Sequence, residues 1–306
     1  MKNMTGGILK GKTKSVLFYN IIAITIIIIW GSTLVSTKVL MQDGMRADEI
    51  FVLRFLLAYL AIWFISPKKL WSDSLRDEAL MLLLGVTGGS LYFITENMAV
   101  GMTYVNNVSF IVSTSPLITM LIAIFTYKGI KIRKILFVGS LLAIIGVGII
   151  IFNGQQVLHL SPTGDFVALI AAACFGVYCY FIKMVGDRYD AVFITRKMFF
   201  YGLITALPLY LFDPWQFPLS HLLDMKILFN LLFLGIVASF ACFALWNVTI
   251  TRIGAVTASN YLYLIPLATV LFSAIFLDET MNLIAWVGCL LIMAGVWMAN
   301  IGCRDD

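Results

Sequence analysis

The segment GVTGGSLYFITENMAVGMTYVNNVSFIVSTSPL, residues 85–117, returns 150 residues later as GIVASFACFALWNVTITRIGAVTASNYLYLIPL, residues 235–267. The matching positions are Gly85 and Gly235, Phe93 and Phe243, Asn97 and Asn247, Ser109 and Ser259, Pro116 and Pro266, Leu117 and Leu267. Over 85–130 and 235–280, eight of 46 positions are identical. This number is modest, so the argument for a repeat depends on which residue types match. Polar Asn and Pro-Leu at equal spacing indicate that the chain consists of two related halves.

The composition is that of a membrane protein. Hydrophobic residues make up 61% of the chain, charged residues 12%, and the mean hydropathy is +0.98, which does not suit a soluble core with a polar surface. A helix needs roughly 20 mostly apolar residues to cross the bilayer. Ten stretches meet this length: 17–40, 47–66, 79–99, 104–126, 133–152, 163–184, 192–212, 227–249, 255–277 and 282–301. We therefore predict an all-α membrane protein with ten transmembrane helices.

Five spans in each half fix the relation between the halves. Because the number is odd, the second half enters the membrane from the opposite side, which gives two inverted five-helix repeats, an arrangement typical of secondary transporters. The predicted division of the chain is an N-terminal tail (1–16), the first repeat (17–152), an inter-repeat loop (153–162), the second repeat (163–301) and a C-terminal tail (302–306).

Positive charge gathers in alternate connections, which predicts the orientation in the membrane. One set contains the lysines of the tail together with Lys68, Lys69, Arg76, Lys128, Lys131, Arg133, Lys134, Lys183 and Arg188. The other set contains Lys38, Arg46 and Lys226. The positive-inside rule places the first set and both termini in the cytoplasm, so the net charge of +5 reports topology and does not indicate binding of nucleic acid.

Two matched prolines predict kinks near the middle of the membrane. Pro116 and Pro266 each lack a backbone donor and free the carbonyl four residues earlier, at Val112 and Leu262. Such carbonyls are tolerated where they face protein or a water-filled cavity. We interpret the two prolines as gating or kink positions beside a central pathway; the alternative is that they simply bend their helices.

The candidate cavity mixes aromatic and hydrogen-bonding side chains, as small-molecule sites do. The residues that we predict to line it are Trp30, Ser32, Thr33, Tyr92, Glu96, Asn97, Ser109, Ser113, Tyr178, Trp246, Asn247, Asn260 and Tyr263. Aromatic belts at the two membrane surfaces give a similar composition, so each position is also open to that interpretation.

Ionisable residues inside the predicted spans are few, and each must pair, face water or snorkel to the surface. Arg54 and Glu96 lie toward the outer ends of their helices, where they form either a pair or two separate snorkelling side chains. For Arg196 and Lys197, near the inner face, snorkelling is the simpler expectation.

Enzyme chemistry finds no support in the sequence. There is no Gly-rich phosphate loop, no spacing of His, Cys or carboxylates that suits a metal, and both histidines, His159 and His221, fall in predicted outer loops. We expect no catalytic residues, no cofactor and no metal. Transport would then run on a gradient or as facilitated flux.

These residues together resemble the EamA family of the drug/metabolite transporter superfamily. The likeness covers almost the whole chain and rests on Trp30-Gly31-Ser32, the Asn and Ser positions of each half, both Pro-Leu pairs, Asp278-Glu279 and the helix with Gly288 and Gly295. It implies a multi-pass inner-membrane carrier, often an exporter of amino acids or related metabolites, with a central site between the halves. The first half departs from the pattern, since Lys128-Gly129 stands where the second half has Asp278-Glu279.

We therefore expect a transporter of small metabolites, most simply an exporter of amino acids or related compounds by alternating access. Two alternatives stay open: an exporter of cationic drugs or amines that uses Glu96, and a membrane scaffold without transport. The expected partners are a small-molecule substrate and the lipid bilayer, with a homo-oligomer left open.

Overall fold

The computed structural model describes residues 2–65, 71–103, 105–126, 134–153, 162–277 and 283–302, and within them every regular element is helical. The predicted inter-repeat loop lies outside these residues except for Asn153 and Pro162, and so does the C-terminal tail except for Gly302. Asp278-Glu279 and Lys128-Gly129 also lie outside them.

The helices of the first half and of the second follow one another in a similar order. The first half contains α1 (Lys2–Gln42), α2 (Ala47–Trp63), α3 (Leu75–Gly85), η1 (Val86–Ser90), α4 (Leu91–Met102), α5 (Val105–Val112), α6 (Ser115–Thr126) and α7 (Lys134–Asn153). The second contains α8 (Pro162–Gly186), α9 (Ala191–Ala206), α10 (Leu209–Phe212), η2 (Leu219–Leu223), α11 (Met225–Leu232), η3 (Phe233–Ala241), α12 (Cys242–Ile253), α13 (Ala255–Ser259), η4 (Asn260–Leu264), α14 (Ile265–Leu277) and α15 (Leu283–Gly302).

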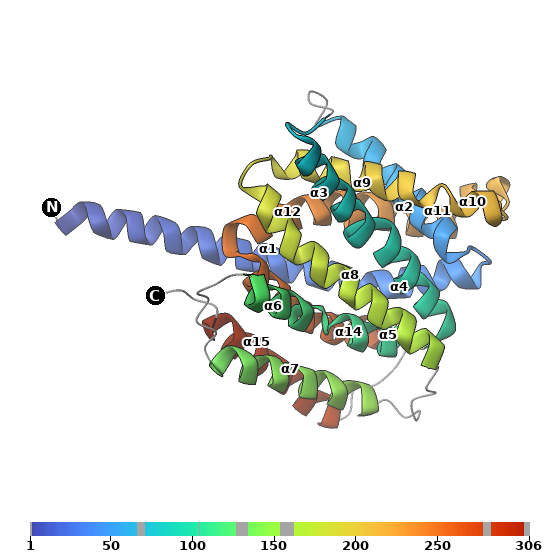
Figure 1. Ribbon diagram of the computed structural model, residues 1–306. Helices are drawn as coiled ribbons and strands as arrows, with labels where there is room; N and C mark the ends of the chain where they lie inside the picture. The colour runs from blue at the N-terminus through green and yellow to red at the C-terminus, as the bar shows by residue number, and fades with distance from the viewer. Residues whose placement is uncertain are drawn as a thin grey trace.

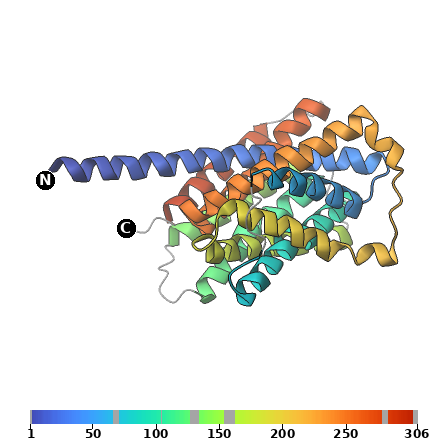
Figure 2. The ribbon, with the colours of Figure 1, turned by 90° about the horizontal axis from the view of Figure 1, so that it is seen from above.

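Six helical stretches are long and apolar enough to cross a bilayer: Val16–Gln42, Leu75–Met102, Thr163–Gly186, Ala191–Phe212, Met225–Ile253 and Ala255–Phe272. Shorter apolar helices occupy Val108–Ala123, Lys134–Gly146 and Trp286–Ala299. The chain is thus an all-helical membrane protein, and the count of ten spans stays a prediction. Helix α1 begins at Lys2, inside the segment that we predicted as a tail, and its N-terminal part projects from the bundle in both ribbon views (Figure 1, Figure 2).

Helices α7 and α15 lie side by side at one edge of the molecule (Figure 1) and approach each other backbone to backbone. A Cβ added to Gly139 would lie 2.5 Å from the nitrogen of Ala299, and one added to Gly295 would lie 2.5 Å from the nitrogen of Ala143. Small residues allow this close approach, which holds helices together in a bilayer. Glycines of α7 and α15 therefore serve the packing of these two helices.

Two further glycines hold the first helix of each half against the other half. In α1, a Cβ on Gly31 would lie 2.5 Å from Ala268 Cβ and 3.1 Å from Ile265 O, both in α14. In α8, a Cβ on Gly176 would lie 2.8 Å from Ile118 Cβ and 2.9 Å from the oxygen of Ser115, both in α6. The contacted positions 265 and 268 are 150 residues beyond 115 and 118. The two crossings are therefore equivalent, and each one joins the two halves.

A buried threonine completes each crossing. Thr269 Oγ1 lies 3.1 Å from Gly31 O and 3.0 Å from Ile265 O, so its proton is shared by carbonyls of α1 and α14. Thr119 Oγ1 lies 3.0 Å from Gly176 O and 3.2 Å from the oxygen of Ser115. Both threonines are at most 1% exposed. We call these two Gly–Thr contacts the paired crossings.

The third long span of each half contains a wide helical turn at the corresponding place. Segment η1 separates α3 from α4, and η3 separates α11 from α12. Gly85 before η1 packs on α9 at Tyr201 and Gly202, whereas Gly235 within η3 packs on α2 at Leu57. In each half, the third span thus packs against the second helix of the other half. Turns of this π type often mark functional sites.

The paired crossings predict different costs for the same substitution at two glycines. Gly31→Ala should destabilise the protein by about 1–3 kcal/mol, because its Cβ meets α14 and the backbone there cannot yield easily. Gly101→Ala in α4 should be neutral or slightly stabilising, because its Cβ would meet the flexible end of Met41. Thermal unfolding in detergent compares the two. Equal melting temperatures would contradict the account.

Candidate functional site

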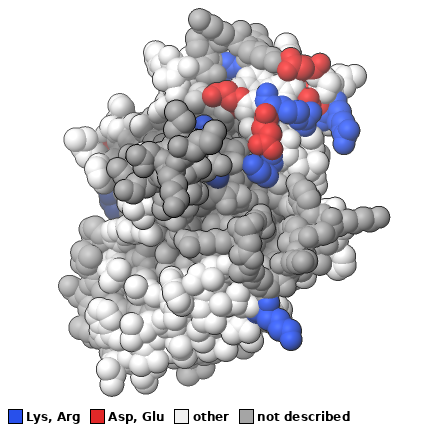
Figure 3. Space-filling model, turned by 90° about the vertical axis from the view of Figure 1, so that its left-hand side faces the viewer, with Lys and Arg blue, Asp and Glu red and all other residues white. Residues whose placement is uncertain are grey.

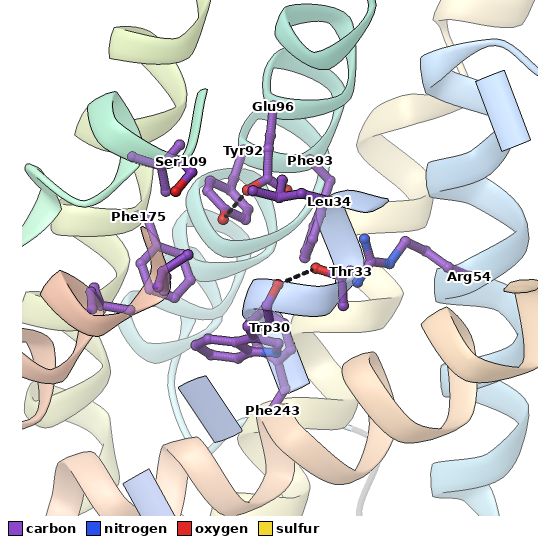
Figure 4. A pocket seen from close by; sticks show the side chains of 13 residues that line it. Trp30, Thr33, Leu34, Arg54, Tyr92, Phe93, Glu96, Ser109, Phe175 and Phe243 are labelled. Carbon is purple, nitrogen blue, oxygen red and sulfur yellow. Dashed lines mark hydrogen bonds between the residues drawn. The ribbon is translucent and has the colours of Figure 1, made fainter. Parts of the chain in front are cut away.

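A small cavity lies where helices of both halves meet. Thirteen residues line it (Figure 4): Trp30, Thr33, Leu34, Arg54, Tyr92, Phe93, Glu96, Ser109, Val112, Phe175, Phe243, Leu262 and Ile265. They come from α1, α2, α4 and α5 of the first half and from α8, α12, η4 and α14 of the second. The space inside is about 20 Å³, which suits a single water molecule. A metabolite therefore requires the surrounding helices to move apart.

Arg54 and Glu96 place opposite charges in this cavity. Arg54 is 1% exposed and Glu96 7% exposed. Nε of Arg54 donates to Ser239 Oγ at 3.0 Å, and its guanidinium lies 4.1 Å from the centre of the Phe93 ring. Because both side chains are buried, neither Arg54 nor Glu96 snorkels to the membrane surface. The ion pairs within 4.0 Å among the described residues do not include these two side chains, so a direct pair is absent as well.

Tyr92 holds Glu96 in place. The two residues are four positions apart on α4 and share a face, and Tyr92 OH donates to Glu96 Oε1 at 2.6 Å (Figure 4). A phenol that donates to a carboxylate forms a charge-assisted bond, which is shorter and stronger than a neutral one. The carboxylate is thereby oriented, and Oε2 makes no hydrogen bond within the described residues.

Aromatic rings form another part of the lining. Trp30 lies in α1, with its ring centre 5.1 Å from Phe243 and 5.7 Å from Phe175. Its Nε1 donates to Ala238 O at 3.0 Å, and its carbonyl accepts from Thr33 Oγ1 at 2.7 Å (Figure 4). Because the indole donor is satisfied by η3, the ring face is available to the cavity. Aromatic pairs at these distances add rigidity to the wall.

The structure brings five of the residues predicted from sequence to the cavity: Trp30, Thr33, Tyr92, Glu96 and Ser109. Another eight are outside its lining: Ser32, Asn97, Ser113, Tyr178, Trp246, Asn247, Asn260 and Tyr263. Seven of these eight are at most 1% exposed, whereas Ser32 is partly exposed. Their role in binding stays a prediction.

Several of these eight residues hydrogen-bond elsewhere. Asn247 accepts from Tyr178 OH and donates through Nδ2 to Thr195 Oγ1 at 2.7 Å, which ties α8, α9 and α12 together. Asn97 Nδ2 donates to Ala47 O at 2.9 Å, at the start of α2. The two matched asparagines therefore both join helices.

Ser32 and Ser113 use their hydroxyls within their own chain segment. Ser32 Oγ donates to Ile29 O at 2.7 Å, and Ser113 Oγ donates to Phe110 O at 2.6 Å. Trp246 stands behind Trp30, with ring centres 5.1 Å apart. Asn260 and Tyr263 are buried in the 3₁₀ segment η4.

Sequence reasoning left eight lining residues out of the candidate cavity: Leu34, Arg54, Phe93, Val112, Phe175, Phe243, Leu262 and Ile265. A signal existed for four of them, since Phe93 and Phe243 are matched positions of the two halves, and Val112 and Leu262 precede the two matched prolines by four residues. Arg54 was recognised as an unusual intramembrane charge, and its burial against the second half could not be read from α2 alone.

Each proline stands at the start of a helix that follows a break. Helix α5 ends at Val112 and α6 begins at Ser115, with Pro116 second in α6; η4 ends at Leu264, with Pro266 second in α14. The carbonyl of Val112 accepts from Ser115 Oγ at 2.6 Å. The carbonyl of Leu262 accepts from the N–H of Ile265. Each carbonyl thus has a substitute donor in place of the N–H that the proline lacks, and both residues line the cavity.

The expectation that Lys197 snorkels to the membrane surface was wrong. Its side chain is 4% exposed and forms an ion pair with Glu78 of α3, which also accepts from Tyr201 OH. The ammonium lies 4.6 Å from the centre of the Trp71 ring, close enough for a cation–π contact. The Lys197 ammonium is therefore neutralised inside the protein by a carboxylate and covered by aromatic rings, and it does not extend to the membrane surface. Arg196 is 2% exposed and lies 5.0 Å from the centre of the Trp63 ring.

Other charges gather at the surface. Figure 3 shows one face of the molecule, on which most of the visible acidic and basic side chains lie together in one area, with single basic side chains elsewhere. Among the described residues no group of three or more His, Cys, Asp or Glu side chains is placed to hold a metal ion.

Comparison with known proteins finds a family match in both halves. Residues 17–152 and 162–301 each match the EamA-like transporter family. A probable amino-acid metabolite efflux pump of Salmonella typhimurium is 27% identical over 293 residues, covering 92% of this chain and 95% of that protein. A probable terminal-alkyne amino-acid exporter of Streptantibioticus cattleyicolor is 24% identical over 275 residues, covering 90% of each chain.

A solved crystal structure shares the fold. It superposes with a TM-score of 0.70 and covers 92% of this chain and 96% of its own, at 16% sequence identity. This likeness concerns the arrangement of helices alone.

The buried ion pair predicts an asymmetric response to mutation. Glu78→Gln should destabilise the protein by about 3–5 kcal/mol, because it leaves the Lys197 ammonium buried without its counter-charge. Adding Lys197→Met should recover most of that loss, since no uncompensated charge remains. Thermal unfolding of the single and double variants in detergent measures the difference. A double variant less stable than Glu78→Gln would contradict the assignment.

Proposed function

Because this chain belongs to the EamA-like transporter family, we propose that it is a secondary exporter of amino acids or related small metabolites that works by alternating access. The observation that carries the proposal is the cavity, which is lined from both halves and contains two buried opposite charges. A scaffold would have no use for such a cavity, since buried charge in a bilayer is costly and commonly functional.

The names of relatives support the substrate class. Two relatives are named for export of amino acids or amino-acid metabolites, and both are matched along nearly their whole length. The cavity fits such cargo because its wall combines aromatic rings with hydroxyl and charged groups.

Alternating access follows from the proposed architecture of ten spans in two inverted repeats. In its support, the paired crossings and the wide turns η1 and η3 recur in both halves at related positions. If the halves are inverted, a motion that opens the cavity at one face has an equivalent motion that opens it at the other. The cavity, too small for cargo in this structure, would then widen toward each face in turn.

We place the protein in the inner membrane as a multi-pass protein with both termini in the cytoplasm. The support is the distribution of basic residues over alternate connections. Residues 43–46, between α1 and α2, are then on the outer face of that membrane, and residues 187–190, between α8 and α9, are on its cytoplasmic face.

An exporter of cationic drugs or amines remains the second candidate. Glu96 favours it, because a buried carboxylate inside the cavity can exchange a cation for a proton. In that case Glu96→Gln abolishes the pH dependence of transport, whereas undiminished pH dependence removes this candidate.

The orientation predicts which turns a membrane-impermeant maleimide reaches. In a background in which the five native cysteines are replaced by alanine, Gln42→Cys should be labelled in intact cells. Asp187→Cys should be labelled only after the cells are opened, because the corresponding turn of the second half then faces the cytoplasm. Labelling of both residues in intact cells would contradict the inverted repeats.

The transport proposal is tested by counterflow in proteoliposomes. Unlabelled amino acids, amines, nucleosides or sugars are loaded inside, and uptake of the labelled compound is followed. We expect accelerated exchange for one or more amino acids, at least tenfold over protein-free vesicles, without ATP. No acceleration for any compound would overturn the proposal.

A further inference from the structure

We propose that the cavity selects compounds that carry a carboxylate and an ammonium group on the same small molecule. Arg54 binds the carboxylate, Glu96 binds the ammonium, and the aromatic wall formed by Trp30, Phe175 and Phe243 receives an apolar side chain. This proposal rests on the proposed function and adds the chemistry by which the cargo is recognised.

Arg54 is built to receive an anion from the cavity. A guanidinium has five N–H donors in a rigid fork that matches a carboxylate in two parallel bonds. One of the five is used within the described residues, by the Nε bond to Ser239. The stacking on Phe93 fixes the plane of the group, and the terminal nitrogens point into the cavity (Figure 4). Because the side chain is 1% exposed, these donors depend on the cavity for their hydrogen bonds.

Glu96 offers the opposite charge from α4. Tyr92 occupies Oε1, which leaves Oε2 as an acceptor toward the cavity. An ammonium is compact and has three donors, so it needs acceptors and no particular plane. Nearby hydroxyls at Thr33 and Ser109 belong to the same lining.

The separation of the two charges explains the preference for a zwitterion. Arg54 and Glu96 line one cavity from α2 and α4 and yet form no direct ion pair. A ligand with one charge satisfies one of them and leaves the other buried alone, which is strongly unfavourable. A ligand with both charges satisfies both, and its net charge of zero matches the net charge of the pair.

The lining also indicates where the remainder of the ligand lies. Phe175 and Phe243 come from α8 and α12 of the second half, whereas both charged residues come from the first half. A ligand bound at the charges therefore directs its side chain toward the second half. Such a ligand bridges the halves, so its binding is coupled to their approach.

Three compounds of nearly equal size test the proposal in the intact protein. Phenylalanine carries both charges, phenylethylamine only the ammonium, and 3-phenylpropionate only the carboxylate. Each is assayed as the internal compound that drives counterflow of labelled phenylalanine into proteoliposomes. We expect phenylalanine to accelerate exchange at least tenfold more than either singly charged compound.

Variants assign the charges to residues. In counterflow of labelled phenylethylamine, Arg54→Gln should raise the activity of the amine relative to phenylalanine at least tenfold. In counterflow of labelled 3-phenylpropionate, Glu96→Gln should do the same for the anion. The control is Arg46→Gln, directly before α2. Arg46 pairs with Asp48 and Asp213 and is outside the cavity lining, so this variant should leave all ratios unchanged. Each variant is first checked for a monodisperse elution profile in detergent.

The outcomes separate this inference from the transport proposal. Equal exchange of the three compounds by the wild-type protein would overturn the zwitterion inference while confirming transport. Well-folded Arg54→Gln and Glu96→Gln proteins that keep the wild-type ratios would overturn it as well. For variants that do not fold, the wild-type comparison of phenylalanine with its methyl ester and its N-acetyl derivative decides the question, since each removes one charge. No exchange of any compound counts against the proposed function itself.

Discussion

The arrangement of this protein depends on the close approach of two helix pairs that the bilayer cannot enforce by hydrophobicity. Lipid is as apolar as the helices, so association requires small residues and hydrogen bonds between backbones. Gly31 against α14 and Gly176 against α6 provide the contact, and Thr269 and Thr119 add the hydrogen bonds. Trp30 directly precedes Gly31, and Thr33 follows it by two residues. The crossing that joins the halves therefore also fixes this part of the cavity wall.

Charge burial is the second constraint, and two places in the bundle meet it differently. At α3 and α9 the Lys197 ammonium is neutralised inside the protein by Glu78 and covered by aromatic rings. At the cavity Arg54 and Glu96 each keep hydrogen-bonding capacity that no described residue uses. A buried polar network in which every hydrogen bond is made stabilises the structure. One in which donors or acceptors are left without partners is suited to binding a ligand. This contrast distinguishes the cavity from the Lys197–Glu78 pair.

Sequence patterns anticipated the features that depend on spacing alone. The 150-residue offset between matched positions recurs in the paired crossings, where Gly176 meets Ser115 and Ile118 and Gly31 meets Ile265 and Ala268. Which polar residues line the cavity was harder to predict from sequence, because a polar side chain can instead form a hydrogen bond with a neighbouring helix. Asn97 and Asn247 do so, at Ala47 and Thr195. Arg54 is the opposite case, a charged residue that sequence reasoning left out of the cavity. Its hydrogen-bond partner, Ser239, lies 185 residues further along the chain, so the sequence around Arg54 does not reveal its environment.

The central claim is that opposite faces of one cavity open in alternation. Spin-label distances test it most directly, with one pair at Met102 and Met225 and a second at Leu75 and Arg252, related by the 150-residue repeat and accessible at the ends of the long spans. The account predicts that adding substrate lengthens one distance while the other shortens. Distances that both stay constant, or that change together in the same sense, would contradict it.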